Sequence, residues 1–391
     1  MTFTPAQTLG GTTVLIAHPA PDVYGSDLQM LETITALARA GSRVVVTLPS
    51  DGPLVAMITE RGAEVAFVDF PVLRRANQSA KAFLGMVWSA IACLPRLVRF
   101  VRRLAPSAIY VNTVTLPWWL LVSRLTRTPT ICHLHEAENT DGGLVRRALL
   151  MPLHLAHAVI VISQSVMTAM VDTDKGLEPK GHLIYNGVPQ PPQAPRPARR
   201  GEPVRAVVVG RLSPRKAPHV ALEAVGRLRD EGYPLEIELA GSAFPGYEWY
   251  VAELEQRAAQ PDLAGAVHFA GYCKPIWPHL ASADLVVAPS LREPFGNAVV
   301  EAQLSLRPVV ATAALGHLES ITDEDTGLLV AAEDVDAMAK AIARIIDDPE
   351  LATGIADRAR ANAIDRFSTD RYEVQVVELV RSLVGPESRA V

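Results

Sequence analysis

The most informative part of the sequence is D-L-V-V-A-P-S-L-R-E-P-F-G-N-A-V-V-E-A, residues 284–302. Its apolar start at 284–288 predicts a buried strand, and Pro294 and Gly296 predict that the strand gives way to a loop. The segment 297–305 then has the composition of a helix. Because free N–H groups and the helix dipole collect at a helix N-terminus, this strand–loop–helix unit predicts a binding site for an anion such as phosphate.

Short apolar runs alternate with helical segments along the rest of the chain. Such alternation is typical of parallel strands covered on both faces by helices. Two series of these units predict an α/β protein with two Rossmann-like, doubly wound domains that face each other across a cleft. The first series of strands is 13–17, 43–48, 64–68, 108–112, 129–134 and 158–162. The second series is 205–209, 235–239, 266–269, 284–288 and 308–312.

A proline-rich segment separates the two series. Residues 189–203 predict an extended linker, because proline forbids a helix interior and favours extended backbone. The expected domains are therefore 1–188 and 204–366. The remaining segment, 367–391, predicts one more amphipathic helix, capped by Ser368 or Thr369.

Composition excludes several classes of protein. The 391 residues are 49% hydrophobic and 20% charged, which excludes a disordered chain. A net charge of −5 gives no argument for a nucleic-acid partner. Cys93, Cys132 and Cys273 lie far apart, which excludes a disulfide framework and favours a reducing cytoplasm. No signal peptide is visible at the N-terminus. The glycine-rich dinucleotide motif is absent after the first strand, which weakens a dehydrogenase interpretation.

Four charged residues form the strongest candidate site. Arg211 and Lys216 follow a predicted strand, where two cations can neutralise a diphosphate; a solvated basic turn is the alternative. Glu293 and Glu301 lie up to about 12 Å apart along a loop and helix. That separation is wider than the roughly 5–9.5 Å of a hydrolytic carboxylate pair. It matches a ligand with a sugar at one end, a pyrophosphate in the middle and a ribose at the other end.

The sequence resembles the retaining glycosyltransferases of family 4, which have the GT-B fold. The resemblance rests on E-x7-E around P-F-G, on G-R-L-x3-K after a strand, and on Asn186-Gly187-Val188 before the linker. It implies that domain 1–188 binds the acceptor, that domain 204–366 binds the nucleotide-sugar, and that the terminal helix returns to the first domain. It further implies that the donor is held by Arg211, Lys216, Glu293, Phe295, Gly296, Asn297, Ala298 and Glu301, with Glu293 on the sugar and Glu301 on the ribose.

In the first domain the resemblance points to a histidine at a strand end. His135 is the best candidate for contact with the transferred sugar, and His133 is the rival. Catalysis is then assigned to His135, Glu293, Arg211 and Lys216. The segment 133–138 also permits a structural role or a metal site, since imidazole and carboxylate suit zinc.

The turn that follows the first strand is the second candidate in this domain. The family commonly has two glycines there; this chain keeps Gly25, where the donor can approach the backbone, and has Ser26 in place of the other. Ser26 and Asp27 are assigned to the acceptor, and helix capping is the alternative. Two further departures are Ala217, where glycine is usual, and the segment 315–319, which keeps only two residues of the family pattern.

The metal and membrane interpretations rest on two other segments. Asp172-Thr173-Asp174 matches a D-x-D metal motif, but three-residue patterns are common by chance, and we expect no required metal or other cofactor. Residues 82–95 are apolar and run into Arg96, Arg99, Arg102 and Arg103; 14 residues are too few to span a bilayer, which takes about 20. The basic and apolar segment 74–103 is either an ordinary packed helix or a helix resting on anionic lipid.

The expected function is transfer of a hexose or deoxyhexose from a nucleotide-sugar to an acceptor hydroxyl, with retention and without a metal. The acceptor is expected to be a sugar or lipid-linked saccharide, in the synthesis of a cell-surface polysaccharide. The expected location is the cytoplasm, with peripheral contact to the inner face of the cell membrane kept open. The alternatives are a soluble enzyme acting on a small molecule and a non-catalytic subunit that binds a nucleotide-sugar.

Overall fold

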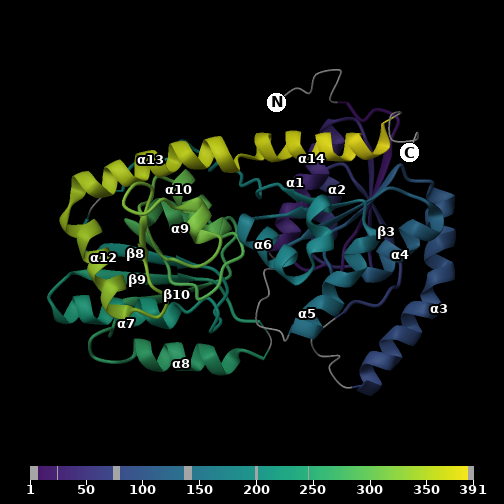
Figure 1. Ribbon diagram of the computed structural model, residues 1–391. Helices are drawn as coiled ribbons and strands as arrows, with labels where there is room; N and C mark the ends of the chain where they lie inside the picture. The colour runs from purple at the N-terminus through teal and green to yellow at the C-terminus, as the bar shows by residue number, and fades with distance from the viewer. Residues whose placement is uncertain are drawn as a thin grey trace. The chain divides into compact units, whose positions relative to one another are not determined.

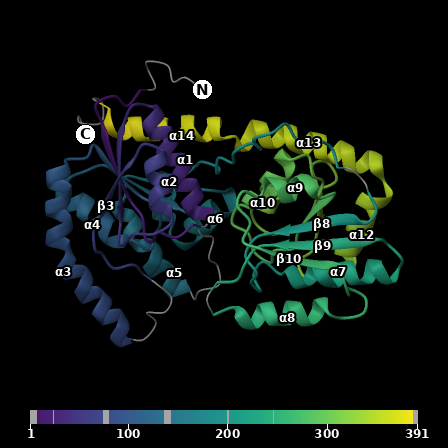
Figure 2. The same ribbon diagram turned by 180° about the vertical axis from the view of Figure 1, so that it is seen from behind.

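The computed structural model describes residues 8–23, 25–73, 80–135, 143–198, 201–244 and 246–385. The chain forms two compact units, drawn in Figures 1 and 2. The first comprises Met1–Gly187 with Thr369–Val391, and the second comprises Val188–Ser368.

In its described part the first unit is built on a sheet of seven parallel strands in the order β3-β2-β1-β4-β5-β6-β7. The strands are β1 (Thr13–Ala17), β2 (Arg43–Leu48), β3 (Glu64–Phe67), β4 (Ala108–Val111), β5 (Thr130–Leu134), β6 (Ala158–Val161) and β7 (Gly181–Leu183). The helices are α1 (Gly25–Arg39), α2 (Leu54–Glu60), α3 (Ala80–Leu104), α4 (Pro117–Thr126), α5 (Gly143–Leu150), α6 (Gln164–Thr173) and α14 (Thr369–Val384). The residues of β4 and β6 are all buried, as expected for inner parallel strands.

The second unit has six parallel strands in the order β10-β9-β8-β11-β12-β13. They are β8 (Val204–Val209), β9 (Leu235–Ala240), β10 (Val267–Gly271), β11 (Leu285–Ala288), β12 (Val309–Thr312) and β13 (Leu328–Val330). The helices are α7 (Pro218–Asp230), α8 (Glu248–Ala258), α9 (Trp277–Ser282), α10 (Asn297–Leu304), α11 (His317–Ser320), α12 (Val335–Asp347) and α13 (Pro349–Phe367).

Both sheets contain a point where the strand order reverses. In the first unit it lies between β1 and β4, and in the second between β8 and β11. At such a point the connections on either side run in opposite directions and leave a crevice at the carboxyl ends of the strands, where α/β proteins bind ligands. The loops that follow β1, β4, β8 and β11 are therefore placed to carry the site.

The predicted fold class is confirmed, and every predicted strand is present to within two residues. Prediction missed β7 and β13, because three residues are too few to show as an apolar run. The linker residues 189–198 and 201–203 are neither helix nor strand. Helix α13 runs to Phe367, and Ser368 separates it from α14.

Helix α14 packs within the first unit although it is remote in sequence. Tyr372, Val376 and Val380 are buried in a core shared with Met30 and Ile34 of α1. The Tyr372 hydroxyl lies 2.5 Å from the Thr33 hydroxyl, and Arg39 donates to Glu373 at 2.9 Å. Helix α14 therefore completes the core to which α1 contributes.

Helix α3 lies at one side of the first unit in both views (Figures 1 and 2). Ala90, Cys93, Leu97 and Val101 form its buried stripe at helical spacing. Its outer face carries two exposed apolar side chains followed by arginines: Trp88, Ile91, Arg96, Arg99, Arg102 and Arg103. None of the helices in the described ranges is long and apolar enough to cross a membrane.

Candidate functional site

The turn after β8 is held by a close contact between two glycines. A side chain at Gly241 would place its Cβ 1.8 Å from the carbonyl oxygen of Gly210, so the backbones touch directly. Gly210 itself has a φ of 140° and donates to the carbonyl of Ala240 at 3.0 Å. The contact fixes the direction in which the chain leaves β8, and hence where Arg211 begins.

Ala217 closes the same turn in the left-handed conformation. Its φ is 49°, and it precedes α7, which begins with Pro218. A glycine would adopt this conformation without steric cost, which explains physically why glycine is the residue expected there. The backbone keeps the conformation despite the alanine, so the position of Lys216 does not depend on that departure.

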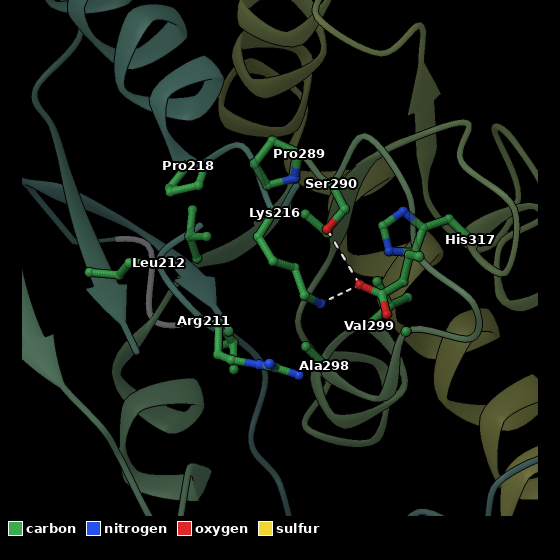
Figure 3. A pocket seen from close by; sticks show the side chains of 15 residues that line it. Arg211, Leu212, Lys216, Pro218, Pro289, Ser290, Ala298, Val299 and His317 are labelled. Carbon is green, nitrogen blue, oxygen red and sulfur yellow. Dashed lines mark hydrogen bonds and ion pairs between the residues drawn. The ribbon is translucent and has the colours of Figure 1, made fainter. Parts of the chain in front are cut away.

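Arg211, Lys216, Ser290, Glu293 and His317 line one pocket at the crevice between β8 and β11 (Figure 3). The Lys216 ammonium donates to Oε2 of Glu293, and the Ser290 hydroxyl lies 3.4 Å from the same oxygen. Lys216 and Glu293 are both mostly buried, with side chains 18% and 11% exposed. The two motifs therefore meet as an ion pair inside a pocket.

The charges around Glu293 keep it ionised. Burial alone would raise the pKa of its carboxyl, but the charge and hydrogen bond of Lys216 and the charge of Arg215 act against burial and bring the pKa below its ordinary value. The ammonium of Lys216 is held in place by the same ion pair with Glu293. The pocket thus combines one fixed negative charge with two nearby cations, Lys216 and Arg211.

Arg211 is oriented by an aromatic ring. Its guanidinium carbon lies 4.0 Å from the centroid of the Phe244 ring, a cation–π contact. In Figure 3 the Arg211 side chain extends toward Ala298, at the start of α10. The guanidinium and the helix N-terminus are thus presented to the same part of the pocket.

The N-terminus of α10 begins where the sequence predicts it. Gly296 precedes the helix with a φ of 98°, and it has no side chain to cap the first turn. Phe295 is buried, and its ring packs edge-on against Phe367 at 5.4 Å. The backbone of Phe295, but not its side chain, is then available to contact a ligand. Ala298 lines the pocket, and Asn297 is the first residue of α10.

His317 is a pocket residue that sequence reasoning missed. Gly316 allows the loop after β12 to pack directly against the backbone of Phe295, because a Cβ at position 316 would lie 2.4 Å from the Cα of Phe295. His317 is buried and its Nδ1 lies 3.0 Å from the carbonyl oxygen of Thr312, which can only accept. The neutral ring therefore carries its proton on Nδ1, and burial lowers its pKa. The feature of the sequence that could have indicated His317 is its position shortly after β12, the strand next to β11.

Glu301 lies in α10, three residues after Ala298, and is half-buried. Burial raises its pKa to about 7, and the charges of Lys216 and Lys274 only partly offset that effect. It is not among the residues that line the pocket around Lys216. Its carboxyl changes charge near neutral pH, unlike that of Glu293.

In the first unit the predicted residues Gly25, Ser26, Asp27 and His135 meet at the carboxyl ends of β1, β4 and β5. Gly25 opens α1, and Asp27 lies in its first turn, where Ser26 Oγ is 3.2 Å from Asp27 Oδ1. Two residues that prediction missed join them: His18 after β1 and Asn112 after β4. Each is a single polar residue after a strand, so only its place in the topology could have indicated it.

His133, in β5, and His135, just after β5, have neutral side chains whose rings lie against each other. Their ring centroids are 3.9 Å apart, and His133 Nδ1 lies 2.6 Å from the Tyr110 hydroxyl. Burial, with a smaller effect of His18, lowers the pKa of His135 to about 3. Burial also holds the pKa of His133 well below its ordinary value. Glu136 and Glu138, the other members of the metal alternative, lie outside the described residues.

The D-x-D segment has a structural role in this chain. Asp174 caps the 3-10 helix Lys175–Lys180 through the N–H of Gly176 at 3.0 Å. Its other carboxylate oxygen lies 2.8 Å from Nε2 of His154. Both interactions use the carboxylate to hold a loop in the first unit.

Two doubly wound units, each with a reversal of strand order, define the GT-B class of fold. Residues 24–190 match the profile described as Glycosyltransferase Family 4, and residues 190–362 match Glycosyl transferases group 1. The chain belongs to the family 4 glycosyltransferases, as the resemblance predicted.

Individual relatives agree with this assignment. The lipopolysaccharide core biosynthesis glycosyltransferase LpsE of Rhizobium meliloti is 31% identical over 47% of this chain and 53% of its own. The D-inositol 3-phosphate glycosyltransferase of Corynebacterium urealyticum is 34% identical over 52% and 50%. The chain thus spans about half the length of these relatives. Anabaena Alr3699/HepE, solved with UDP and glucose, superposes with a TM-score of 0.80 at 25% identity over 95% of this chain and 100% of that one.

Proposed function

We propose that this protein transfers a hexose or deoxyhexose from a nucleotide-sugar to an acceptor hydroxyl with retention of anomeric configuration. The observation that carries the proposal is the single pocket in which Arg211, Lys216 and Glu293 meet the N-terminus of α10. Two cations and a helix N-terminus suit a diphosphate, and a buried carboxylate suits sugar hydroxyls. The family assignment and the UDP complex of HepE support the same kind of ligand.

Every predicted site residue except Asp27 receives a role in this proposal. Arg211 and Lys216 stabilise the charge that develops on the departing diphosphate, supported by backbone N–H groups of 295–298. Glu293 accepts hydrogen bonds from the transferred sugar, and Glu301 accepts them from the ribose. Gly25 permits a close backbone approach to the donor, and Ser26 supplies a hydroxyl for the acceptor. His135 contacts the transferred sugar.

Retention follows from the face of the anomeric carbon that the acceptor attacks. In the proposed reaction the diphosphate oxygen leaves the anomeric carbon on the face that the acceptor attacks. The same oxygen takes the acceptor proton as the new glycosidic bond forms, so no strong protein base is needed. Lys216 and Arg211 supply the positive charge that such a leaving group requires, and we therefore propose that no metal is needed.

The decisive experiment is a thermal-shift screen with UDP-, GDP-, dTDP- and ADP-sugars, in EDTA. A ligand that binds only the native state stabilises it by RT ln(1 + [L]/Kd), which is about 2.7 kcal/mol at a hundredfold excess over Kd. We expect a shift with one nucleotide class and transfer activity that persists in EDTA. Activity that is lost in EDTA and restored by manganese would refute metal independence. A shift without hydrolysis or transfer would favour the non-catalytic binding subunit.

We further propose that the acceptor is presented at an anionic membrane surface, as in the synthesis of a cell-surface polysaccharide. The support is the outer face of α3, where Trp88 and Ile91 are 73% and 54% exposed and arginines follow. Aromatic and apolar side chains beside arginines are typical of helices at a lipid interface.

Flotation with vesicles tests the membrane proposal. The wild-type protein should float with vesicles containing phosphatidylglycerol and not with phosphatidylcholine alone. Trp88→Ser together with Arg99→Glu should abolish flotation, whereas Arg205→Glu, a surface change in the second unit, should not. Failure of the wild-type protein to float would leave the soluble enzyme acting on a small molecule as the better proposal.

A further inference from the structure

Three neighbouring strand ends of the first unit bring a chain of buried polar groups together. Asn112 Nδ2 lies 3.1 Å from His18 Nδ1, and Asn112 Oδ1 lies 3.3 Å from His135 Nε2. His18 and Asn112 are each 1% exposed, and Asp27 is 6% exposed. Buried polar groups that satisfy one another in this way fix each other's orientation.

The orientation of the Asn112 amide is set by groups that can only accept. Its Nδ2 also points to the carbonyl oxygen of Ser26, at 3.4 Å, and a carbonyl cannot donate. The NH2 group therefore faces Ser26 and His18, and the Asn112 oxygen faces His135. The reverse amide orientation would place two acceptors against each other at Ser26.

This orientation determines the proton positions on both histidines. His18 Nδ1 accepts from Asn112, so the proton of the neutral His18 ring is on Nε2. Asp27 Oδ1 lies 3.1 Å from that Nε2 and attracts the proton electrostatically. His135 Nε2 faces an oxygen and must donate, so its Nδ1 is the nitrogen without a proton.

We propose that Asp27, His18 and Asn112 are positioning residues that hold His135 as the neutral Nε2–H tautomer, with Nδ1 as a hydrogen-bond acceptor for a hydroxyl. The hydroxyl partner is the transferred sugar, and this part rests on the role proposed for His135 above. A neutral acceptor orients a sugar hydroxyl without adding positive charge beside a centre that itself becomes positive in the reaction. Among the residues that the structure describes, the groups that face His135 are His133 of β5, with His18, Asp27 and Asn112 from other elements.

The proton positions can be read directly by NMR of the protein labelled with ¹⁵N-histidine. His18→Gln and His135→Gln assign the two rings by loss of signal. From the hydrogen-bond geometry we expect a proton on Nε2 and none on Nδ1 in both rings. A wild-type His135 with its proton on Nδ1 would overturn the proposal, whatever the activity of the protein.

Asp27→Asn is the key variant because asparagine has nearly the shape of aspartate. It replaces a carboxylate that can only accept hydrogen bonds with an amide that can also donate one. Its amide can donate to His18, which allows the Asn112 amide to turn and His135 to take the other tautomer. We expect mixed tautomers at His135 and a kcat lower by roughly 10- to 100-fold, with a smaller change in donor KM. The matched control is Asp174→Asn, which alters a second Asp–His contact of this unit and should leave kcat and the His135 signals unchanged; Asn also caps helices well.

The double variant Asp27→Asn with Asn112→Asp separates positioning from packing. The new carboxylate at position 112 would accept from both histidines, and the new amide at position 27 would donate to His18. The carboxylate cannot donate to the Ser26 carbonyl as Asn112 Nδ2 does, so only partial recovery is expected. The direction of the hydrogen bonds at His18 then reverses, while His135 keeps its Nε2 proton. We expect the His135 signal and part of kcat to be restored relative to Asp27→Asn. A double variant slower than both single variants, with mixed His135 tautomers, would overturn the relay.

These results also distinguish failure of the relay from failure of the proposed function. If His135→Ala leaves kcat unchanged, the role of His135 on the sugar is wrong, while the NMR tautomers still test the relay. If His135→Ala lowers kcat but Asp27→Asn changes neither kcat nor the His135 signals, the relay is wrong and the role of His135 stands.

Discussion

The ammonium of Lys216 and the carboxylate of Glu293 bind each other, although they belong to different motifs 77 positions apart. The two groups that we assign to the phosphate and to the sugar thus neutralise each other before any donor is bound. When a donor binds, its phosphates and its sugar must take the place of this ion pair as partners of the two side chains. Until then, the ion pair holds both side chains near the positions in which we propose that they bind the donor. Removing either partner therefore affects stability as well as catalysis.

Lys216→Met should destabilise the protein by about 1–3 kcal/mol at pH 7, because it leaves the Glu293 carboxylate buried without its partner. The double variant with Glu293→Gln should recover part of that loss, although both variants should lack transfer activity. Urea unfolding at pH 7 and pH 4 measures the effect. The Glu293 pKa is lowered in the folded state, so its contribution is present above the ordinary glutamate pKa and is lost as the pH falls through the folded value. Equal stability of wild type and Lys216→Met at pH 7 would contradict the pairing.

Donor binding should depend on pH through Glu301. Its pKa of about 7 means that the carboxyl is protonated in acid, and a protonated carboxyl is a poorer acceptor for ribose hydroxyls. Affinity for the nucleotide-sugar selected by the screen should weaken below pH 7 by up to about tenfold per pH unit. Titration calorimetry between pH 6 and pH 8 measures it, with the intact sugar-nucleotide because its diphosphate does not titrate there. Glu301→Gln should bind more weakly at pH 8 and show a flat profile; an equally steep profile in that variant would remove Glu301 from the effect.

Gly316→Ala should destabilise the second unit and displace His317. The new methyl group would meet the Cα of Phe295 at 2.4 Å, a backbone atom that cannot move aside without shifting the pocket loop. We expect a loss of about 1–3 kcal/mol in the free energy of unfolding, together with weaker donor binding. Gly85→Ala is the control, since nothing lies within 4 Å of its Cβ and alanine favours its helix. Comparable thermal stability of the two variants would show that the loops are not in contact.

Phe244→Leu should weaken donor binding without unfolding the protein. The leucine keeps an apolar side chain but removes the ring face beneath the Arg211 guanidinium, a contact worth about 0.5–1 kcal/mol, or roughly two- to fivefold in Kd. Calorimetry with the same donor measures the change. Tyr247→Leu, on the same loop with its ring 38% exposed, should leave Kd unchanged. Weakening by both variants to the same extent would point to the loop as a whole instead of the Arg211 contact.

The sequence predicted the parts of the molecule that are marked by a run of apolar residues or by a motif of several residues. Buried strands showed as apolar runs, and Glu293, Arg211 and Lys216 showed because each stands in a motif next to a strand end. His317, His18 and Asn112 left no such pattern, since each is one polar residue whose neighbours come from other strands. The pairing of Lys216 with Glu293 was also hidden, because it depends on β8 and β11 being adjacent, which only the strand order reveals.

The return of α14 to the first unit has a consequence for synthesis on the ribosome. When residues 1–187 have emerged, α1 still lacks the partners of its buried face, because Tyr372, Val376 and Val380 are not yet translated. The second unit, Val188–Ser368, is continuous in sequence and can complete its own core first. Nascent chains of this protein should therefore reverse the usual N-terminal-first order and leave an apolar surface of α1 exposed until Thr369–Val384 has been synthesised.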